Sequence, residues 1–367
     1  MPRIVLFGAT GYTGDLTARE LVRRGQTPVL AARNPERLEA LADELGGLPT
    51  QTADVGDRAS VRALVERGDV LVSTVGPFLR WGEPAVEAAI GAGAHYLDST
   101  GEGAFIRRVF EEYGPRADRA DIGLMTAMGY DWVPGNLAGA LALRGAGPEA
   151  RRVEIGYFMT GGSMTDGMSG GTRASAVGMS IETGYTFQGG RVVSERGGRR
   201  LRSFELSPGR TAPAISVGSS EQFTLPRLRP ELLEVDTYLG WFGPASRPLQ
   251  AFSAATSLAT KVPGVKSGIQ AVAERLVKGS TGGPDADARA QSGSLVLARA
   301  LDAGGRELAA VRLSGPNGYD LTAAFLAWGA ETALAGGLQG TGALGPVDGF
   351  GLDVLEAAAA SYGLERG

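Results

Sequence analysis

Short apolar runs alternate with amphipathic segments from Arg3 to Met128. Amphipathic segments between consecutive apolar runs are typical of βαβ units, whose strands lie parallel in one sheet. The pattern therefore predicts an α/β domain with a doubly wound parallel sheet. Its six predicted strands span residues 3–7, 27–32, 50–55, 69–75, 95–99 and 122–127.

The clearest predicted helix lies in ARNPERLEALADEL, residues 32–45. Asn34 is a good N-cap residue, and Pro35 fits the first helical position. Helical spacing places four apolar residues on one face: Leu38, Leu41, Ala42 and Leu45.

After residue 150 the apolar pattern changes to longer alternating runs such as RRVEIGYFM, which predict a second domain of the α+β class. In residues 294–314, two such runs flank the turn-forming sequence DAGG and predict a hairpin. Residues 278–293 have the composition of a loop or linker.

The tail returns to helical spacing from Tyr319 and predicts a closing helix that packs on either domain. The apolar positions that define this spacing are Leu321, Ala324, Phe325, Trp328 and Leu334. The predicted division is a dinucleotide-binding domain over 1–132, a substrate domain over 133–318, and C-terminal helices over 319–367.

Composition excludes several classes of chemistry. Cysteine is absent from the 367 residues, which rules out disulfides, zinc–thiolate sites and a thiolate nucleophile. The formal net charge of -4, with both signs interspersed, provides no basic face for nucleic acid. Met1 leads directly into a predicted strand, and no uncharged apolar run approaches the roughly 18 residues of a membrane helix. We therefore expect no signal peptide, no integral membrane segment and a cytoplasmic location.

The sequence FGATGYTG places Gly8, Gly11 and Gly14 directly after the first predicted strand and at the start of a helix. In such a turn the first glycine permits the sharp bend, the second allows a pyrophosphate to approach the backbone, and the third lets the helix pack closely. The helix N-terminus offers free N–H groups to the anion. A bare strand–turn–helix without a ligand is the alternative.

The end of the second predicted strand indicates which dinucleotide binds. A site for NAD carries Asp or Glu about 20 residues after the glycines, to bind the ribose hydroxyls. Here Arg33 and Asn34 occupy that position, and a guanidinium suits the 2′-phosphate of NADP(H). The alternative is that Arg33 is a solvated residue at a strand end.

Two further turns are expected to line the same ligand. Asp54 follows the third predicted strand, where such folds line the adenine, and STVGPF (73–78) follows the fourth, beside the nicotinamide ribose. His95, the only histidine, opens a predicted strand, where a structural role is expected. No His or Cys cluster provides a catalytic metal site. Hydride transfer needs neither, because a dinucleotide supplies the reactive carbon.

Several stretches together resemble the saccharopine dehydrogenase-like reductases, a family that includes lysine-pathway saccharopine dehydrogenases and bacterial trans-acting enoyl reductases. The resemblance spans nearly the whole chain, and residues 73–102 are its most specific block. The stretches are GATGYTG (8–14), LAARNPERLEAL (30–41), STVGPFLRWGEPAVEAAIGAGAHYLDSTGE (73–102), MGYDWVPGNLA (128–138), SGGTRASAV (169–177) and GYDLTAA (318–324).

The resemblance implies a Rossmann-like sheet with an inserted α+β domain for substrate binding or dimerisation, so that a homodimer is one expected assembly. It also implies NADPH as cofactor. The residues it assigns to the dinucleotide are Gly8, Thr10, Gly11, Tyr12, Thr13 and Gly14 at the phosphates, Arg33 at the 2′-phosphate, and Thr74, Val75, Gly76 and Pro77 on the nicotinamide side.

The implied reaction is NADPH-dependent reduction of a C=C bond in an enoyl or polyketide-like substrate, or of a C=N bond. A lysine-pathway saccharopine dehydrogenase and a catalytically inactive dinucleotide-sensing regulator are the alternatives. The expected substrate is a small molecule of lipid- or polyketide-like chemistry.

Three residues are candidates for catalysis. Tyr130 and Asp131, in the turn after the sixth predicted strand, are candidates to donate a proton or position the substrate. Thr172, in the glycine-rich stretch that starts at Ser169, is a candidate to polarise a carbonyl oxygen. Capping of a helix start is the alternative for each of them.

Overall fold

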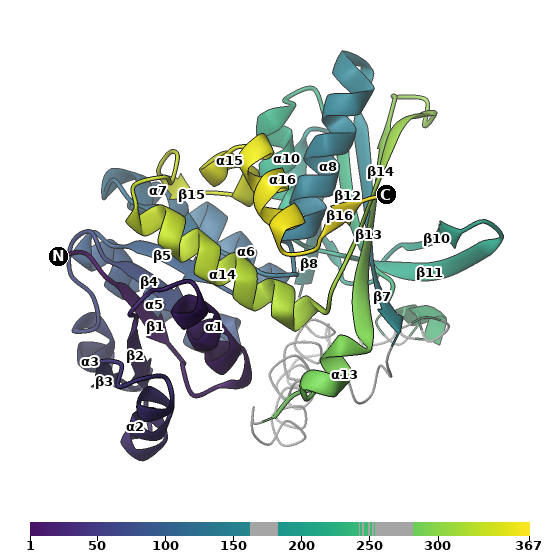
Figure 1. The fold of residues 1–367 in the computed structure, drawn as a ribbon. Coiled ribbons are helices and arrows are strands. Elements are labelled where there is room, and N and C mark those ends of the chain that lie inside the picture. Colours follow the sequence, from purple (N-terminus) through teal and green to yellow (C-terminus); the bar gives the residue numbers. More distant parts are fainter. Residues whose placement is uncertain (162–182, 242, 244–245, 249, 252, 254–281) are drawn as a thin grey trace. The chain divides into compact units, whose positions relative to one another are not determined.

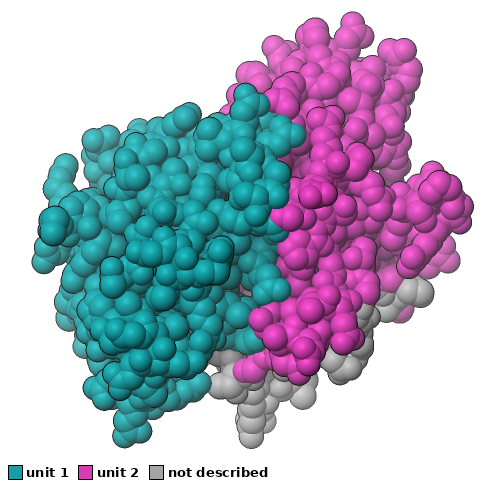
Figure 2. Space-filling view, in the orientation of Figure 1, with its two compact units in different colours: residues 1–101, 105–133, 318–362 teal, residues 102–104, 134–317, 363–367 magenta. Residues whose placement is uncertain are grey.

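The computed structural model describes residues 1–161, 183–241, 243, 246–248, 250, 251, 253 and 282–367 (Figure 1). The stretch SGGTRASAV, with Ser169 and Thr172, lies outside the described residues. The chain forms two compact units, coloured separately in Figure 2. Unit 1 comprises Met1–Gly101, Phe105–Val133 and Gly318–Tyr362, and unit 2 comprises Glu102–Ala104, Pro134–Asn317 and Gly363–Gly367.

Unit 1 contains a seven-stranded parallel sheet, which confirms the predicted fold class. Its strand order is β15-β6-β5-β4-β1-β2-β3. Six strands match the predicted ones, whereas β15 was not predicted. The bounds are β1 (Ile4–Phe7), β2 (Val29–Ala32), β3 (Thr50–Thr52), β4 (Val70–Ser73), β5 (His95–Asp98), β6 (Gly123–Met125) and β15 (Gly342–Ala343).

Helices connect these strands. They are α1 (Tyr12–Arg23), α2 (Pro35–Glu44), α3 (Arg58–Arg62), α4 (Phe78–Trp81), α5 (Glu83–Ala92), α6 (Gly103–Arg108), the π-helix η1 (Val109–Tyr113), α7 (Gly114–Arg119), α14 (Gly318–Leu334), α15 (Pro346–Phe350) and α16 (Leu352–Ser361). Helix α2 confirms its prediction, because the Asn34 side chain accepts a hydrogen bond of 2.8 Å from the Arg37 N–H and Leu38, Leu41 and Ala42 are buried.

The closing helix predicted in the tail is α14, and it belongs to unit 1. It lies beside α1 and packs against β1, β4 and β5 (Figure 1). The side chains of Leu321, Phe325 and Trp328 are buried. Residues more than 300 positions apart therefore share one hydrophobic core, and Arg24 of α1 is ion-paired with Glu331 of α14.

Unit 2 contains a mixed sheet of nine strands. The main path runs β10-β11-β12-β7-β13-β14-β16, and β8 pairs with β12 and β9. The bounds are β7 (Arg152–Gly161), β8 (Thr183–Gln188), β9 (Arg191–Arg196), β10 (Leu201–Ser207), β11 (Arg210–Val217), β12 (Glu234–Leu239), β13 (Ser292–Leu301), β14 (Glu307–Gly315) and β16 (Glu365–Arg366). Strands β13 and β14 form the predicted hairpin, and Asp302 accepts a hydrogen bond from Gly304 N in its turn.

The described helices of unit 2 are α8 (Val133–Ala146), the 3-10 helix η2 (Gly147–Glu149), α10 (Glu221–Leu228) and α13 (Ala286–Ala290). Residues 278–293 were predicted as a loop, but α13 lies within them because Asp285 caps its N-terminus by accepting a hydrogen bond from Ala288 N. A second core on this sheet packs Phe158, Phe204, Ala214, Tyr238 and Leu295 together.

The division at residues 132 and 318, with C-terminal helices that pack back on the rest of the chain, remains a prediction. Among the helices that the structure describes, none is long and apolar enough to cross a membrane.

Candidate functional site

The candidate site lies at one edge of the unit 1 sheet. Because the strands are parallel, their carboxyl ends meet at this edge, where open α/β sheets bind ligands. The loops after β1, β2, β3, β4 and β6, together with the first turn of α1, carry every predicted dinucleotide residue as well as Tyr130 and Asp131.

The chain itself requires the first and third glycines of the motif. Gly8 has a φ of +93°, and a Cβ atom there would lie 2.7 Å from Thr74 Oγ1. A Cβ atom on Gly14 would lie 2.1 Å from the carbonyl oxygen of Gly8, which no small shift relieves. These two glycines let α1 dock against the loop that follows β1.

Gly11 differs from its neighbours because the chain does not require it to be glycine. Its φ of −82° and ψ of 166° suit any residue, and a Cβ atom would meet only the Gly8 carbonyl oxygen, at 3.2 Å. Gly11 is also the N-cap of α1 and has no side chain to cap that helix. A ligand that approaches the backbone here would find space and the N–H groups of the first turn.

The other residues of the loop have contacts of their own. The Thr10 carbonyl oxygen accepts from Arg37 Nη2 at 3.5 Å, and the Thr13 carbonyl oxygen accepts from Thr17 Oγ1 at 2.8 Å. The ring of Tyr12 packs edge-on against Tyr319 of α14, with 5.1 Å between centroids.

Two arginines lie at the end of β2. Arg33 is exposed, and within the described residues its guanidinium has no carboxylate partner. Arg37, one turn into α2, contacts the glycine loop and was not predicted as a site residue. Its signal in the sequence was its spacing of four residues from Arg33, which places both after the same strand.

The residues after β3 and the cap of α2 are partly committed to local structure. Asn34 uses its side-chain oxygen to cap α2. Asp54 Oδ1 accepts from Gly56 N at 2.7 Å, and Asp54 N donates to Ser60 Oγ. Both residues lie at the expected edge.

The turn after β4 is tied to the glycine loop. Thr74 Oγ1 lies 3.3 Å from the Phe7 carbonyl oxygen and 3.2 Å from that of Gly8, and it donates to them. Val75 Cγ2 would lie 2.9 Å from a Cβ atom on Gly8. Gly76 and Pro77 follow, and Pro77 is the N-cap of α4. These hydrogen bonds therefore hold the turn expected at the nicotinamide against the loop expected at the phosphates.

Sequence reasoning missed Asp98, the last residue of β5. Its buried carboxylate accepts hydrogen bonds from Thr100 N, Ala127 N and Thr126 Oγ1, each at 2.9 Å. Burial raises the pKa of Asp98 to about 6, although the hydrogen bonds from Ala127 and Thr100 act to lower it. A carboxylate at the end of an apolar strand was the available signal.

The loop after β6 carries the two predicted catalytic residues. Ala127, the second residue of this loop, has a φ of 61° although it is not glycine. Such strain persists only where surrounding contacts impose it, and here Asp98 binds Ala127 N and Met128 N. The loop then leads into α8 through Tyr130 and Asp131.

Asp131 has a carboxyl group without a hydrogen-bond partner. Within the described part of the chain its Oδ1 is buried and unpaired, and Oδ2 lies against Gly101, where a Cβ atom would approach to 2.9 Å. Burial raises the pKa of Asp131 to about 7. The carboxylate does not cap α8, because Gly135 N in the first turn donates instead to Tyr157 Oη at 2.7 Å. A carboxyl group with a pKa near neutrality is suited to proton transfer.

His95 has a structural position. Its Nδ1 accepts a hydrogen bond of 3.0 Å from Gly123 N, and burial lowers its pKa. Among the residues that the structure describes, no group of His, Cys, Asp or Glu could hold a metal ion.

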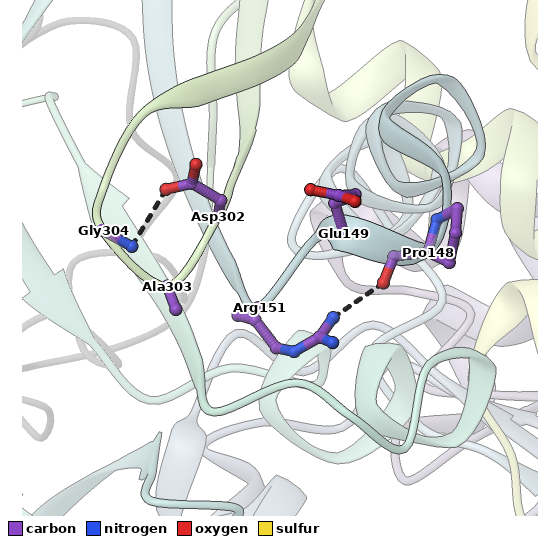
Figure 3. Close-up of a pocket in the computed structure, with 6 residues that line it drawn as sticks. All are labelled: Pro148, Glu149, Arg151, Asp302, Ala303 and Gly304. Carbon is purple, nitrogen blue, oxygen red and sulfur yellow. Dashed lines mark hydrogen bonds between the residues drawn. The ribbon is translucent and has the colours of Figure 1, made fainter.

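A groove in unit 2 is unrelated to these loops (Figure 3). Pro148, Glu149, Arg151, Asp302, Ala303 and Gly304 line it. Its polar groups are occupied locally, since Arg151 donates to the Pro148 carbonyl oxygen and Asp302 is ion-paired with Arg306.

A glycine turn between β1 and α1, at the carboxyl edge of a parallel sheet, is typical of dinucleotide-binding proteins. Residues 4–122 match the family described as saccharopine dehydrogenase NADP binding domain. This part of the chain is therefore similar to a domain that binds NADP, which indicates a nicotinamide dinucleotide as its ligand.

Curated relatives match parts of the chain. A trans-acting enoyl reductase of Mycobacterium ulcerans is 39% identical over 140 residues, which are 36% of this chain and 34% of that protein. A protein of Mycobacterium tuberculosis, provisionally named as a trans-acting enoyl reductase, is 38% identical over 179 residues, 47% of this chain and 42% of its own. The chain thus spans less than half the length of these relatives.

The fold extends the similarity over the whole chain. The apo saccharopine dehydrogenase (L-Glu forming) of Saccharomyces cerevisiae superposes with a TM-score of 0.60 over 100% of this chain and 99% of that one. The two sequences are 12% identical, so the match concerns the fold alone.

Substitutions at Gly11 and Gly14 should separate binding from folding. Gly14→Ala should destabilise the protein by about 1–3 kcal/mol, because its methyl group collides with the Gly8 carbonyl. Gly11→Ala should cost about 1 kcal/mol or less but weaken NADPH binding, because its methyl occupies the open side of the turn. Denaturant unfolding and calorimetric titration measure the two effects. Unchanged NADPH affinity in Gly11→Ala would show that the turn is only structural.

Arg33→Ala should weaken NADPH binding about 10- to 100-fold, because a charge-assisted hydrogen bond contributes about 1.5–3 kcal/mol. The affinity for NADH, which lacks the 2′-phosphate, should barely change. Arg37→Ala should act in the same direction. Titration of each variant with both dinucleotides tests this, and an equal loss for NADPH and NADH would contradict it.

Asp98→Ala should destabilise the protein by about 2–4 kcal/mol, because it leaves three buried donors without an acceptor. Asp98→Asn should cost less, since the amide oxygen still accepts from both N–H groups and the Thr126 hydroxyl can turn to accept. Urea unfolding of the two variants measures their losses of stability. A larger loss for Asp98→Asn than for Asp98→Ala would show that Asp98 does not stabilise the protein as a hydrogen-bond acceptor.

Proposed function

We propose that this protein is an NADPH-dependent reductase that adds hydrogen across a polarised C=C bond, with Asp131 as the source of the proton. The observation that carries the proposal is the buried, unpaired Oδ1 of the Asp131 carboxyl group, at the same sheet edge as the open turn at Gly11. One feature accommodates a dinucleotide, and the other provides an acid at the same edge of the sheet.

The residues of the edge fit NADPH. The backbone from Gly8 to Gly14 would hold the pyrophosphate, Arg33 and Arg37 the 2′-phosphate, and Asp54 would line the adenine side. Thr74 to Pro77 would hold the nicotinamide side. When bound, the dinucleotide supplies the hydride.

Asp131 would complete the reduction. Adding a hydride to one carbon of a C=C bond leaves electron density on the conjugated system, and the second carbon must gain a proton. A carboxyl group with a pKa of about 7 is protonated in half of the molecules near neutral pH and returns to that state from solvent. Tyr130 directly precedes Asp131 in the chain, and its side chain is buried. On this proposal it would position the substrate.

An enoyl substrate is favoured over an imine because the curated relatives that match this chain carry enoyl reductase names. On this proposal the substrate is a lipid- or polyketide-like enoyl compound. Thr172, which lies outside the described residues, stays a predicted residue for polarising its carbonyl oxygen. Action in the cytoplasm as a homodimer is part of the proposal.

A panel of acceptors tests the reaction. Purified protein with NADPH should consume the cofactor in the presence of enoyl thioesters or enones, as followed by NADPH absorbance, and product mass should increase by two hydrogens. Turnover confined to imines would redirect the proposal to C=N reduction. Tight NADPH binding without turnover on any acceptor would favour the dinucleotide-sensing regulator instead.

Asp131→Asn should lower kcat about 10²- to 10⁴-fold and remove the decline in kcat that we expect above about pH 7 in the native protein. The decline follows because the acid is lost as pH rises through its folded-state pKa of about 7. The measurement is kcat against pH for both proteins. If both profiles fall alike, another group supplies the proton.

A further inference from the structure

Helix α14 touches the loop that carries Tyr130 and Asp131. Thr322, in the first turns of this helix, accepts a hydrogen bond of 2.9 Å from Tyr130 N through its Oγ1. The same hydroxyl donates to the carbonyl oxygen of Gly318 at 2.7 Å. One hydroxyl group therefore connects the helix start to the backbone of the residue before Asp131.

Two close contacts accompany this hydrogen bond. A Cβ atom on Gly129 would lie 3.0 Å from the methyl group and from the hydroxyl oxygen of Thr322. A Cβ atom on Gly318 would lie 2.8 Å from Cδ1 of the Tyr130 ring. Glycine at both positions allows the loop and the helix to approach each other at the point where Thr322 bonds.

The loop is thus anchored from two directions. Asp98 holds its beginning, through Ala127 N and Met128 N. Thr322 holds Tyr130 N, while the loop's own turn bonds join Val133 N to the Gly129 carbonyl oxygen. Asp131 follows directly after the second anchor, and its carboxyl group is bound by no hydrogen bond of its own within the described residues. Its position therefore depends on the backbone that these anchors fix.

We propose that Thr322 is a positioning residue for proton transfer, and that the start of α14, residues 318–322, forms the seat that holds Asp131 against Gly101. This proposal rests on the proposed function for its kinetic consequence. The seat itself is a property of the fold and can be tested without a substrate.

The kinetic test compares three variants on the same helix. Thr322→Val keeps the branched shape and removes the hydroxyl, whereas Thr322→Ser keeps the hydroxyl. Thr332→Val is a matched control, since Thr332 Oγ1 makes the same kind of hydrogen bond to the residue four positions earlier, Trp328, at 2.8 Å.

Thr322→Val should lower kcat about tenfold or more with NADPH affinity within about twofold, because small misplacements of a catalytic group are costly. Thr322→Ser should recover most of the activity, and Thr332→Val should match the native protein. The decline of kcat with rising pH should move to lower pH in Thr322→Val, because a displaced carboxyl group gains water. Equal losses in the Val and Ser variants, or in the Thr332 control, would overturn the proposal.

A substrate-free test uses the stability of native protein, Asp131→Asn, Thr322→Val and the double variant. Since the folded pKa of Asp131, about 7, lies above its unfolded value near 4, ionisation costs stability as pH rises between those values. Asp131→Asn should therefore raise the melting temperature more at pH 8 than at pH 5.

This gain should shrink in the Thr322→Val background if Thr322 holds the carboxyl group in its buried position. An undiminished gain would overturn the seat. Absence of turnover by the native protein on every acceptor would overturn the proposed function, while the stability comparison would still decide the role of Thr322.

Discussion

The close approach of α1 to the loop after β1 is the constraint on which the rest of unit 1 depends. Gly14 lies so near the Gly8 carbonyl that any side chain would collide with it. The same approach leaves Gly8 in contact with the turn after β4. Gly8 and Gly14 thus hold three parts of the chain together: the loop after β1, helix α1 and the turn after β4.

A second constraint acts on the opposite half of the edge, where buried polar groups replace glycine packing. Asp98 and Thr322 both satisfy backbone N–H groups of a loop that has little regular structure. Buried N–H groups without partners are costly, so such a loop needs external acceptors to hold one conformation. The contrast with Asp131 is informative, because its Oδ1 is buried in the same loop and receives no hydrogen bond within the described residues. A buried polar atom that is kept without a partner, despite its cost in stability, is typical of functional sites.

The sequence predicts those features that are set by neighbours along the chain. Asn34 and Pro35 mark the start of α2, apolar runs mark six strands, and Gly8, Gly11 and Gly14 mark the turn. It does not predict contacts between distant residues. Nothing near Thr322 in the sequence points to Tyr130, and β15, two residues long, has no periodicity to detect. The unpaired state of Asp131 also escapes prediction, because it depends on what fails to approach the side chain in three dimensions.

The position of α14 has a consequence for how the protein is made. Unit 1 takes its strands β1 to β6 from the first part of the chain and its helix α14 from residues 318–334. During synthesis, nearly 200 residues of unit 2 emerge between them. The sheet face that α14 covers, with the apolar side of α1, therefore has no native partner until residues 318–334 have been synthesised. The candidate site cannot assemble before that point, and apolar surface left uncovered in a nascent chain is prone to aggregate.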